Sequence, residues 1–308
     1  MRPVLLILLV SFISLTGKMD MTEKDAPALA FSFDDGNPND ILTYKGEEWN
    51  NRIVQTLKKY KIDAVWFVEA KNMNNNKGKL LLKNWDRSGN LIANHTFTHL
   101  NYDDEKVSIE RYENEILSCD SFIHTYINYR KLFRFPYLKA GNSERKRDGI
   151  LSFLKNINYN QGWVTIDNSD WYINSRMIRS LQQNPKRNIE DYKKYYLEHI
   201  YDRAVYYNTL SEEINQREIK HTLLLHFNLT TALFLEDLIK MFKARGWRIE
   251  NYSSAIKDPI YNFQPSSLPN EQSLIWMQAK ELGSFDKVLR YPGEDGDFEK
   301  EKMEKAGL

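Results

Sequence analysis

The sequence predicts an α/β fold built on a parallel sheet, either doubly wound or closed as a barrel. Short apolar runs of strand length alternate with helical patterns throughout residues 28–256, and this alternation is typical of parallel sheets with crossover helices. Polar residues follow five of the expected strands. Because parallel α/β folds gather their functional residues at the carboxyl ends of the strands, the pattern indicates a site at that edge.

The expected elements follow one another in a regular order. Strands are expected at residues 28–33, 64–68, 91–93, 132–135, 163–166, 222–225 and 248–249. Helices are expected where apolar residues recur at helical spacing, at 49–60, 80–88, 108–129, 150–156 and 231–244. Pro136 stops the fourth strand, because proline has no N–H to donate to a neighbouring strand.

Two segments depart from this alternation. A long, polar, helix-rich insert fills residues 172–220. Residues 259–308 contain a proline-marked loop, a short helical pattern at 271–282, a turn-rich stretch and a highly charged end. We expect this tail to pack on the main domain or fray, and not to form a domain of its own.

The composition indicates a folded protein with few charge-driven partners. Hydrophobic residues make up 42% of the 308 residues and the formal net charge is +1. A sequence-independent nucleic-acid binder needs a basic excess to neutralise phosphates, so we expect no nucleic-acid partner. Cys119 is the only cysteine. An intramolecular disulfide and a thiolate-rich zinc site are therefore excluded, and any metal ion must be held by His, Asp or Glu.

Residues 1–17 have the pattern of an export signal. Arg2 precedes an apolar run at residues 4–15, and a charged lysine follows at position 18. A run of this length is too short to cross a ~30 Å hydrocarbon core, so a signal peptide is favoured over a stable membrane span. An uncleaved anchor is the alternative. We expect a periplasmic or extracellular location, at the cell envelope if the signal is not cleaved.

Three side chains near two strand ends have the composition of a metal site. His95 and His99 are four residues apart after the third expected strand, and Asp35 ends the first. Two imidazoles and one carboxylate, with positions left open, form the ligand set of hydrolytic zinc sites. We expect one divalent ion, with Zn²⁺ first and Co²⁺, Ni²⁺ or Fe²⁺ suited to the same ligands.

The other polar strand ends could supply acid–base groups. Adjacent residues at a strand end point to different sides, so Asp34 and Asp35 need not both bind the metal ion. If Asp35 binds it, Asp34 can stay free as a general base for activated water. Arg134 could hold Asp34 by a charge-assisted pair. His226 could donate a proton, with Asp167 raising its pKa and fixing its orientation. Taken singly, these last three residues also fit a structural ion pair, a buried core histidine and a helix cap.

Five strings of residues occur in an order that points to one family. They are FSFDDG at residues 31–36, NHTFTH at 94–99, RFPY at 134–137, DNSDW at 167–171 and LLH at 224–226. Together they resemble the five motifs of the polysaccharide deacetylases of carbohydrate esterase family 4, the NodB-homology proteins. The resemblance covers roughly residues 28–256. It implies a distorted (β/α)7 barrel at residues 26–258, with the insert at 172–220 and a C-terminal extension at 259–308 packed on the barrel.

The resemblance also implies an enzyme and assigns the acid–base roles. The activity is hydrolysis of acetyl groups on sugars, and for N-acetyl groups this is cleavage of a carbon–nitrogen bond in a linear amide. By the same resemblance Asp34 is the base and Arg134 orients it. His226 is the general acid, tuned by Asp167. The metal ligands implied are Asp35, His95 and His99.

The remaining motif residues are implied to contact the substrate. The backbone N–H of Tyr137 would stabilise the oxyanion together with the metal ion. Trp171 and Leu224 would line the groove that takes the acetyl group. The string Asp34-Asp35-Gly36-Asn37-Pro38 has one residue more than the family's usual Asp-Asp-Gly-Pro. The insert at 172–220 is expected at the rim of the groove. These two departures leave the substrate open.

We expect a carbohydrate partner and an N-acetyl substrate, in a glycan that contains N-acetylglucosamine such as peptidoglycan or a chitin-like polymer. An O-acetyl esterase of the xylan type is the first alternative, because the same residues serve both reactions. A hydrolase of small non-sugar amides is more distant. A catalytically silent glycan-binding module is the alternative from another class, although none of the motif residues is missing.

Overall fold

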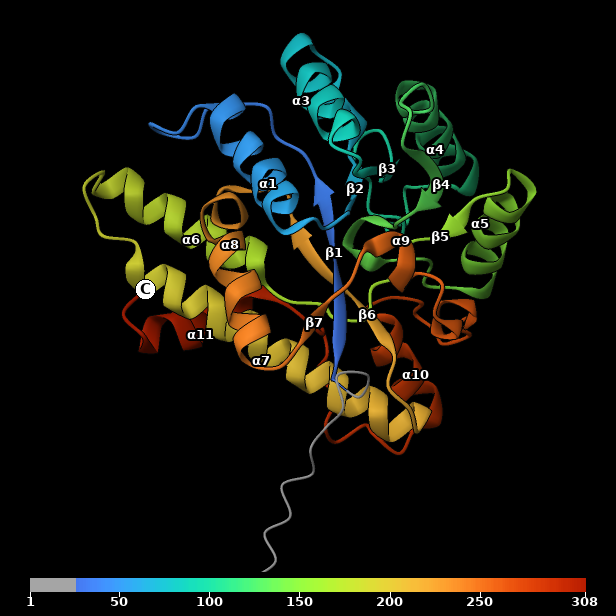
Figure 1. The fold of residues 1–308 in the computed structure, drawn as a ribbon. Coiled ribbons are helices and arrows are strands. Elements are labelled where there is room, and N and C mark those ends of the chain that lie inside the picture. The colour runs from blue at the N-terminus through green and yellow to red at the C-terminus, as the bar shows by residue number, and fades with distance from the viewer. Residues whose placement is uncertain (1–25) are drawn as a thin grey trace, which may run out of the picture.

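A computed structural model describes residues 26–308 of the chain. Its centre is a parallel sheet of seven strands, curled into a half-barrel with helices around its outside (Figure 1). The strands are β1 Ala28–Asp35, β2 Val65–Val68, β3 Leu91–Asn94, β4 Tyr129–Phe133, β5 Asn160–Gln161, β6 Lys220–His226 and β7 Arg248–Ile249. The predicted fold class, a distorted (β/α) barrel, is confirmed. The expected export signal lies outside the described residues.

The strand order brings the predicted polar residues to one edge. It runs β5-β4-β3-β2-β1-β6, and β7 pairs with the start of β1. In this register Asp34 of β1 is aligned with His226 of β6, and Asp35 with Val68 of β2. Val68 is in turn aligned with Asn94, the last residue of β3. The carboxyl ends of four strands therefore lie side by side, although they are far apart in sequence.

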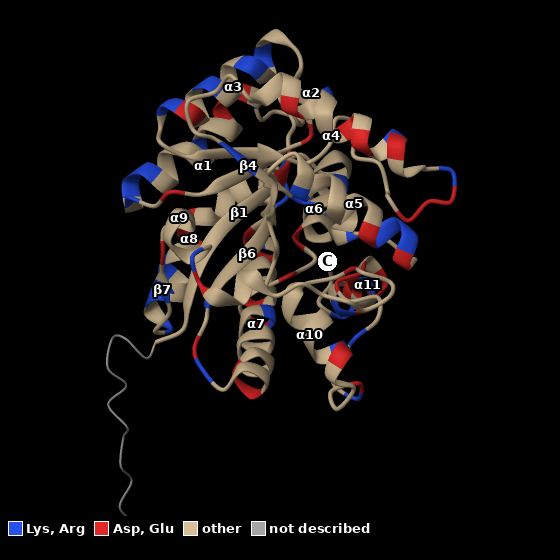
Figure 2. Ribbon diagram, turned by 90° about the vertical axis from the view of Figure 1, so that its right-hand side faces the viewer, with Lys and Arg blue, Asp and Glu red and all other residues tan. Residues whose placement is uncertain are grey.

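The helices cover the outer face of the sheet, and Lys, Arg, Asp and Glu lie mainly on these outer elements (Figure 2). They are α1 Gly46–Tyr60, α2 Ala70–Met73, α3 Asn76–Arg87, α4 Ile109–Ile123, α5 Glu144–Asn156, α6 Asp170–Gln183, α7 Glu190–Asn215, α8 Leu229–Ala244, α9 Tyr252–Ala255, α10 Leu274–Leu282 and α11 Gly296–Lys305. Two 3-10 turns, Pro136–Leu138 and Pro259–Asn262, complete the fold. No helix within residues 26–308 is long and apolar enough to cross a bilayer.

Capping explains two helix boundaries that the sequence pattern missed. The helix predicted at 150–156 begins earlier, at Glu144, because the Ser143 side chain accepts a hydrogen bond from the Lys146 N–H. The helix predicted at 231–244 begins at Leu229, where Asn228 accepts from the Thr231 N–H. Hydrogen bonds from the first free N–H groups to these side chains thus extend each helix beyond the apolar repeat.

The strand predicted at residues 163–166 is absent from the sheet. Gly162 still donates its N–H to Phe133 of β4, but Ile166 already donates to Thr222 of β6. Only an isolated parallel bridge, Ile166 with Leu223, forms there. Within the five residues 162–166 the chain passes from β4 to β6. This segment is too short to pair with either strand over several residues. This crossing is what distorts the barrel between β5 and β6.

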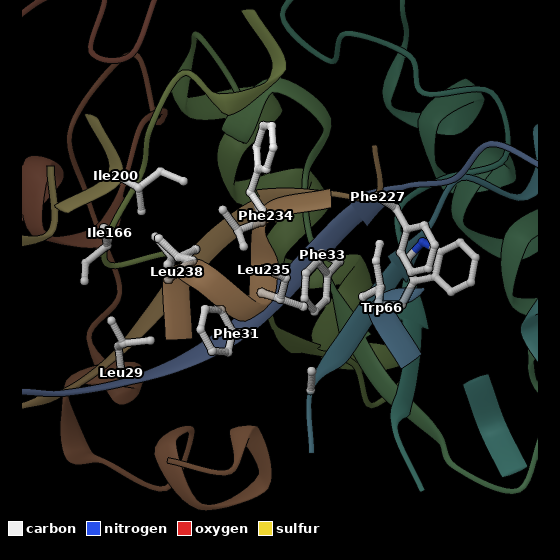
Figure 3. Packing of buried hydrophobic residues seen from close by; sticks show 14 of the residues in the cluster. Leu29, Phe31, Phe33, Trp66, Ile166, Ile200, Phe227, Phe234, Leu235 and Leu238 are labelled. Atoms are coloured by element: carbon white, nitrogen blue, oxygen red, sulfur yellow. The ribbon is translucent and has the colours of Figure 1, made fainter. Parts of the chain in front are cut away.

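Aromatic packing fixes the ends of the strands that carry the site. The buried rings of Trp66 and Phe227 are stacked, with centroids 3.9 Å apart (Figure 3). Trp85 meets Phe227 edge to face at 5.6 Å. Trp66 also donates its indole N–H to the backbone carbonyl of Asp35, at 2.7 Å. Burial of one such side chain stabilises by roughly 1.5–3 kcal/mol, so the backbone beside Asp35 and beyond His226 is held firmly.

The C-terminal segment is tied to the insert by a buried ion pair and a buried hydrogen bond. Glu294 lies 2.5 Å from Arg203 of α7 and also pairs with Arg290. Glu299 of α11 accepts a hydrogen bond of 3.1 Å from Nδ1 of His199 of α7, whose Nε2 accepts from Ser169. Removing one partner of a buried pair is costly, because the other charge is left unpaired away from water. These contacts therefore fix the position of the chain on either side of Glu294.

The cluster of His199, Glu294 and Glu299 also brings three potential ligand atoms together. Two arginines already oppose the charge of Glu294. The ring Nε2 of His199 accepts a hydrogen bond from the Ser169 N–H, at 3.0 Å. With these contacts made, the cluster is a structural network of ion pairs and hydrogen bonds.

Candidate active site

A cavity of about 430 Å³ opens at the carboxyl edge of the strands. It is lined by every residue predicted for the site except Arg134, which lies behind it. The lining comprises Asp34, Asp35, His95, His99, Tyr137, Leu138, Lys139, Asp167, Trp171, Leu224, His226, Gln272, Pro292, Gly293, Glu294 and Asp295. A larger cavity, of about 1000 Å³ between α5 and α9, contains none of the predicted residues. The smaller cavity is therefore the candidate active site.

The three predicted metal ligands converge in this cavity. Oδ1 of Asp35 lies 3.3 Å from Nε2 of His99 and 3.6 Å from Nε2 of His95. The ring Nδ1 of His95 is 2.8 Å from the Arg134 carbonyl oxygen. A protonated Nδ1 makes this bond, and the lone pair of Nε2 is then directed at Asp35. One carboxylate oxygen and two imidazole nitrogens thus face the same point.

The chemistry of this donor set fits a divalent cation. Oδ1 of Asp35 is shielded from water and accepts no hydrogen bond within residues 26–308. Buried polar atoms are normally paired, and an unpaired carboxylate oxygen beside two lone pairs is unfavourable without a cation. Burial lowers the pKa of His99 and holds the pKa of His95 well below its usual value. Both rings are thus kept in the neutral form that binds metal ions.

Asp34 is bound through one carboxylate oxygen by Arg134, and its other oxygen, Oδ2, lies 3.7 Å from Nε2 of His95. Oδ1 of Asp34 accepts a hydrogen bond of 2.6 Å from the Arg134 guanidinium, which also donates to Ser32 and to the Gly162 carbonyl. The guanidinium stacks 3.9 Å from the Phe67 ring centroid. Burial raises the pKa of Asp34 to about 6, although the charges of Arg134 and His226 lower it. Asp34 is therefore a buried carboxylate with raised basicity, as a general base requires.

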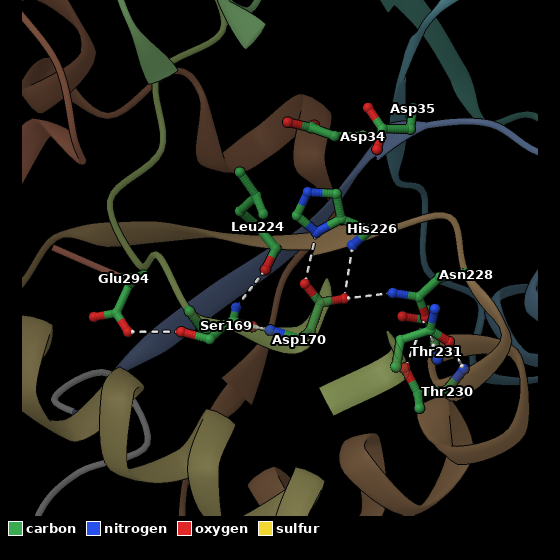
Figure 4. Close-up of polar contacts among 12 residues, drawn as sticks. Asp34, Asp35, Ser169, Asp170, Leu224, His226, Asn228, Thr230, Thr231 and Glu294 are labelled. Atoms are coloured by element: carbon green, nitrogen blue, oxygen red, sulfur yellow. Dashed lines mark hydrogen bonds and ion pairs between the residues drawn. The ribbon is translucent and has the colours of Figure 1, made fainter. Parts of the chain in front are cut away.

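His226 is oriented by Asp170, and not by Asp167 as the sequence suggested. Oδ1 of Asp170 lies 2.6 Å from Nδ1 of His226, and Oδ2 accepts from the His226 backbone N–H at 2.9 Å. Asn228 donates a third bond to Asp170, at 3.0 Å (Figure 4). Burial by itself lowers the pKa of His226, but the charge of Asp170 and the bond to it raise the pKa to about 10. The assignment of this role to Asp167 is corrected.

The reason for the difference is local. Asp170 is the first residue of α6, and this position turns its carboxylate toward the end of β6. Asp167 lies three residues earlier, and its Oδ1 accepts the Asn168 N–H at 2.8 Å. Burial and the neighbouring charge of Glu294 raise the pKa of Asp167. Asp167 therefore lines the cavity beside Glu294, without a bond to the imidazole.

The residues expected to contact substrate lie around the mouth and wall of the cavity. Trp171 is 41% exposed and Leu224 is buried. The Tyr137 ring is exposed and packs on His99, with centroids 4.6 Å apart. Both aromatic rings are thus available to a ligand at the surface. The structure places these side chains at the cavity, and their roles stay predictions.

The backbone of the site is strained. Ten of the described non-glycine residues have a positive φ, and five of them, Asp35, Thr96, His99, Tyr137 and Leu138, belong to the strand ends around the cavity. A positive φ costs energy for residues with a side chain and persists only where the surroundings impose it. Hydrogen bonds impose it here, for example from the His99 N–H to Oγ1 of Thr96 at 3.0 Å. This concentration of strain is typical of functional sites.

Sequence reasoning missed the contribution of the C-terminal segment. Gln272 and residues 292–295 line the cavity, more than 40 residues beyond the last motif. Gly296 follows them in close contact with the rings of Trp171 and Tyr172. A side chain at this position would collide with those rings, so the lone glycine marks a close approach. Only the tertiary fold shows which surface it approaches.

Replacing Asp170 by asparagine is expected to lower kcat by roughly 10²-fold or more, because the imidazolium of His226 loses its partner and orientation. Asp167→Asn should cause a much smaller loss. The pKa of His226, followed by NMR of labelled histidine, should fall in Asp170→Asn and stay unchanged in Asp167→Asn. A larger loss from Asp167→Asn would restore the sequence-based assignment.

Comparison with known proteins finds a family match over part of the chain. Residues 22–152 match the family model described as polysaccharide deacetylase. No curated protein matches the chain in sequence. Among solved structures, the polysaccharide deacetylase Bc1974 from Bacillus cereus is similar over 73% of this chain and 92% of its own, with 20% identity and a TM-score of 0.52.

Two further structures show the same fold. Wild-type BA3943 from Bacillus anthracis, a CE4 family pseudoenzyme, matches over 75% of this chain and 66% of its own, with 16% identity and a TM-score of 0.50. A BA3943 mutant with restored enzymatic activity matches over 75% and 68%, with 18% identity and a TM-score of 0.51. The match covers residues 22–152, less than half of the chain. Together with the barrel and the convergent site described above, it supports a hydrolase domain of the polysaccharide deacetylase type in this part of the chain.

Proposed function

We propose that the chain removes acetyl groups from an N-acetylated carbohydrate, in a glycan that contains N-acetylglucosamine. One observation carries the proposal. A buried carboxylate held by Arg134 and an imidazole held by Asp170 line the same cavity as the ligand set Asp35, His95 and His99. A base and an acid beside an electrophilic centre are what hydrolysis of an unactivated amide needs.

The proposed cofactor is one divalent ion, with Zn²⁺ as the first choice. Asp35, His95 and His99 would hold it, and when bound it would polarise the acetyl carbonyl and make water more acidic. Two neutral imidazoles and one carboxylate suit zinc, and also cobalt, nickel and iron. Metal analysis of the purified protein would identify which of these ions it binds.

The chain's own residues would move two protons. Asp34, ionised and fixed by Arg134, takes a proton from the water molecule whose oxygen attacks the acetyl carbon. His226, kept protonated by Asp170, gives a proton to the sugar nitrogen as the carbon–nitrogen bond breaks. Acetate and a free amine are the products. The backbone N–H of Tyr137 is proposed to donate to the carbonyl oxygen while that oxygen carries charge.

Two residues are proposed to hold the substrate. Leu224 presents an apolar surface for the acetyl methyl group, and Trp171 presents a ring on which a pyranose can stack. The intact set of acid, base and ligands favours an enzyme over a silent binding module. The proposed location is outside the cytoplasm, from the signal pattern at residues 1–17.

The test is acetate release from the purified protein with zinc or cobalt added. The substrates are chitooligosaccharides, peptidoglycan fragments, acetylated xylan and an aryl acetate. EDTA-sensitive release from the N-acetylated sugars is the expected result. Release from O-acetyl substrates alone would replace the proposal by an esterase. If the metal-bound protein releases acetate from none of these substrates, the alternative is a glycan-binding module. A glycan-binding assay would then test that alternative.

A further inference from the structure

The loop at residues 96–99 sets the distance between the two histidines of the candidate metal site. It leads from His95, which follows β3, to His99. Thr96 and His99 have positive φ angles of 67° and 58°. A loop in this conformation persists only where its surroundings impose it. The direction of the His99 ring therefore depends on the contacts that hold this loop.

The start of the loop is held by the end of β3 and by α2. Oδ1 of Asn94 accepts a hydrogen bond from the Thr96 N–H, at 2.9 Å. The carbonyl groups of residues 96 and 97 accept from the first two N–H groups of α2, at 3.2 and 2.8 Å. These bonds fix the part of the loop that is next to His95.

The end of the loop is held by a charged side chain of α4. Oε2 of Glu115 accepts a hydrogen bond from the Thr98 N–H, at 2.6 Å. Within residues 26–308, no other side chain from outside residues 94–99 bonds to the backbone of the loop. A bond to a carboxylate is stronger than a bond between neutral groups, and Glu115 is half-buried. Glu115 is thus the main side-chain support of the loop beside His99.

Helix α4 is itself fixed relative to the metal site. It packs on β3 (Figure 1). The Ile116 carbonyl, next to Glu115, accepts a hydrogen bond of 2.9 Å from the Asn94 side chain. One turn later Asp120 accepts from the Tyr159 hydroxyl at 2.5 Å, and this hydroxyl also accepts from Asn94, at 3.2 Å. The carboxylate of Glu115 therefore starts from a rigid position.

We propose that Glu115 is a positioning residue of the metal site, which sets the affinity for the ion by holding the loop that carries His99. The identity of the ion-binding site rests on the proposed function. Without this carboxylate, His95 keeps its bond to the Arg134 carbonyl. The His99 end of the loop, however, loses its outer support. Ordering that end when the ion binds then costs conformational entropy, which weakens binding.

Zinc affinity of metal-free protein, measured by competition with a chelating indicator, tests the proposal without turnover. Glu115→Ala should bind zinc roughly 10–100-fold more weakly than wild type, the usual loss when a contact behind a metal ligand is removed. Glu115→Gln retains an oxygen that can accept the Thr98 N–H, and it should recover most of the affinity. Glu115→Asp retains the charge on a shorter side chain, so its affinity should stay low.

Glu113→Ala is the matched control, because Glu113 is a carboxylate on the same helix that does not bond to the loop. It should bind zinc like wild type. The visible absorption of bound Co²⁺, which reports ligand geometry, should change in Glu115→Ala and stay unchanged in Glu113→Ala. Thermal unfolding of the metal-free variants separates positioning from stability. A lower Tm with unchanged zinc affinity in Glu115→Ala would show a purely structural role and overturn the proposal.

Other results would also overturn the proposal. They are an equal loss of affinity in Glu113→Ala, or a recovery by Glu115→Asp and not by Glu115→Gln. The comparison of these two variants decides the matter if Glu115→Ala does not fold. Wild type that binds no zinc would reject both the proposed function and the role of Glu115. If zinc binds and depends on Glu115 as expected but no acetate is released, the proposed function fails and the positioning role stands.

Discussion

Replacing Asp35 or His99 by alanine is expected to abolish metal binding and acetate release together. Each residue supplies one of the three ligand atoms that converge in the catalytic cavity, and the remaining two atoms are too few for tight binding of a divalent ion. Metal content after dialysis against buffer with trace zinc should fall from about one ion per chain to near zero. Acetate release should fall to the uncatalysed background.

His124→Ala is a suitable control for this pair. His124 is exposed at the end of α4, where its Nδ1 lies 3.0 Å from the Asp120 carbonyl oxygen. This variant also loses one histidine, but it should keep both metal and activity. Full metal content in Asp35→Ala or His99→Ala would show that the ion is bound elsewhere.

Asp34→Asn should separate metal binding from catalysis. The three ligands are unchanged, so the metal content should match the wild type. The amide cannot take a proton from water, and kcat should fall by roughly 10²–10⁴-fold. KM should change little, because Asp34 is proposed to act on the attacking water and not on the sugar. A near-normal rate would remove Asp34 from the reaction.

The stability of the Asp34→Asn variant needs its own measurement. The neutral amide would leave the buried Arg134 without its ionic partner, although the bonds to Ser32 and Gly162 remain. Breaking a buried pair costs about 3–5 kcal/mol. Thermal unfolding should therefore show a lower Tm, while the folded fraction at the assay temperature is checked by circular dichroism. A rate corrected for folded fraction then reports on the chemistry alone.

The strands and the ligand set could be predicted because their signals are local. Asp34 and Asp35 end an apolar run, and His95 and His99 follow another, so strand length and spacing alone place them at one edge. Both faces of these strands are buried, so each strand is a continuous apolar run. Such runs are typical of parallel sheets, and the prediction of parallel strands was therefore correct. The strand order in the sheet, which places β6 beside β1, is seen in the structure and not in the order of the motifs.

The partner of His226 could not be predicted in the same way. Asp167 and Asp170 are three residues apart, and either could face the imidazole until the start of α6 is known. A helix rotates successive side chains by about 100°, so an error of one residue in its start changes which carboxylate points inward. No local pattern in the chain favours the second aspartate over the first.

The position of Glu294 in the lining of the cavity could not be predicted from the sequence for another reason. Its position depends on ion pairs with Arg203 and on packing of Gly296 against Trp171, over more than 90 residues of sequence. No periodic or motif signal connects these segments. The same holds for residues 163–166, whose strand-like composition was overridden by the crossing between β4 and β6.

The most direct test of the central claim is a zinc titration of metal-free protein, with acetate release from chitotetraose measured in each sample. The rate should rise in proportion to bound zinc and level off at one ion per chain. In Asp34→Asn the same amount of zinc should bind with almost no release. A rate in the wild type that does not depend on bound metal would contradict the account.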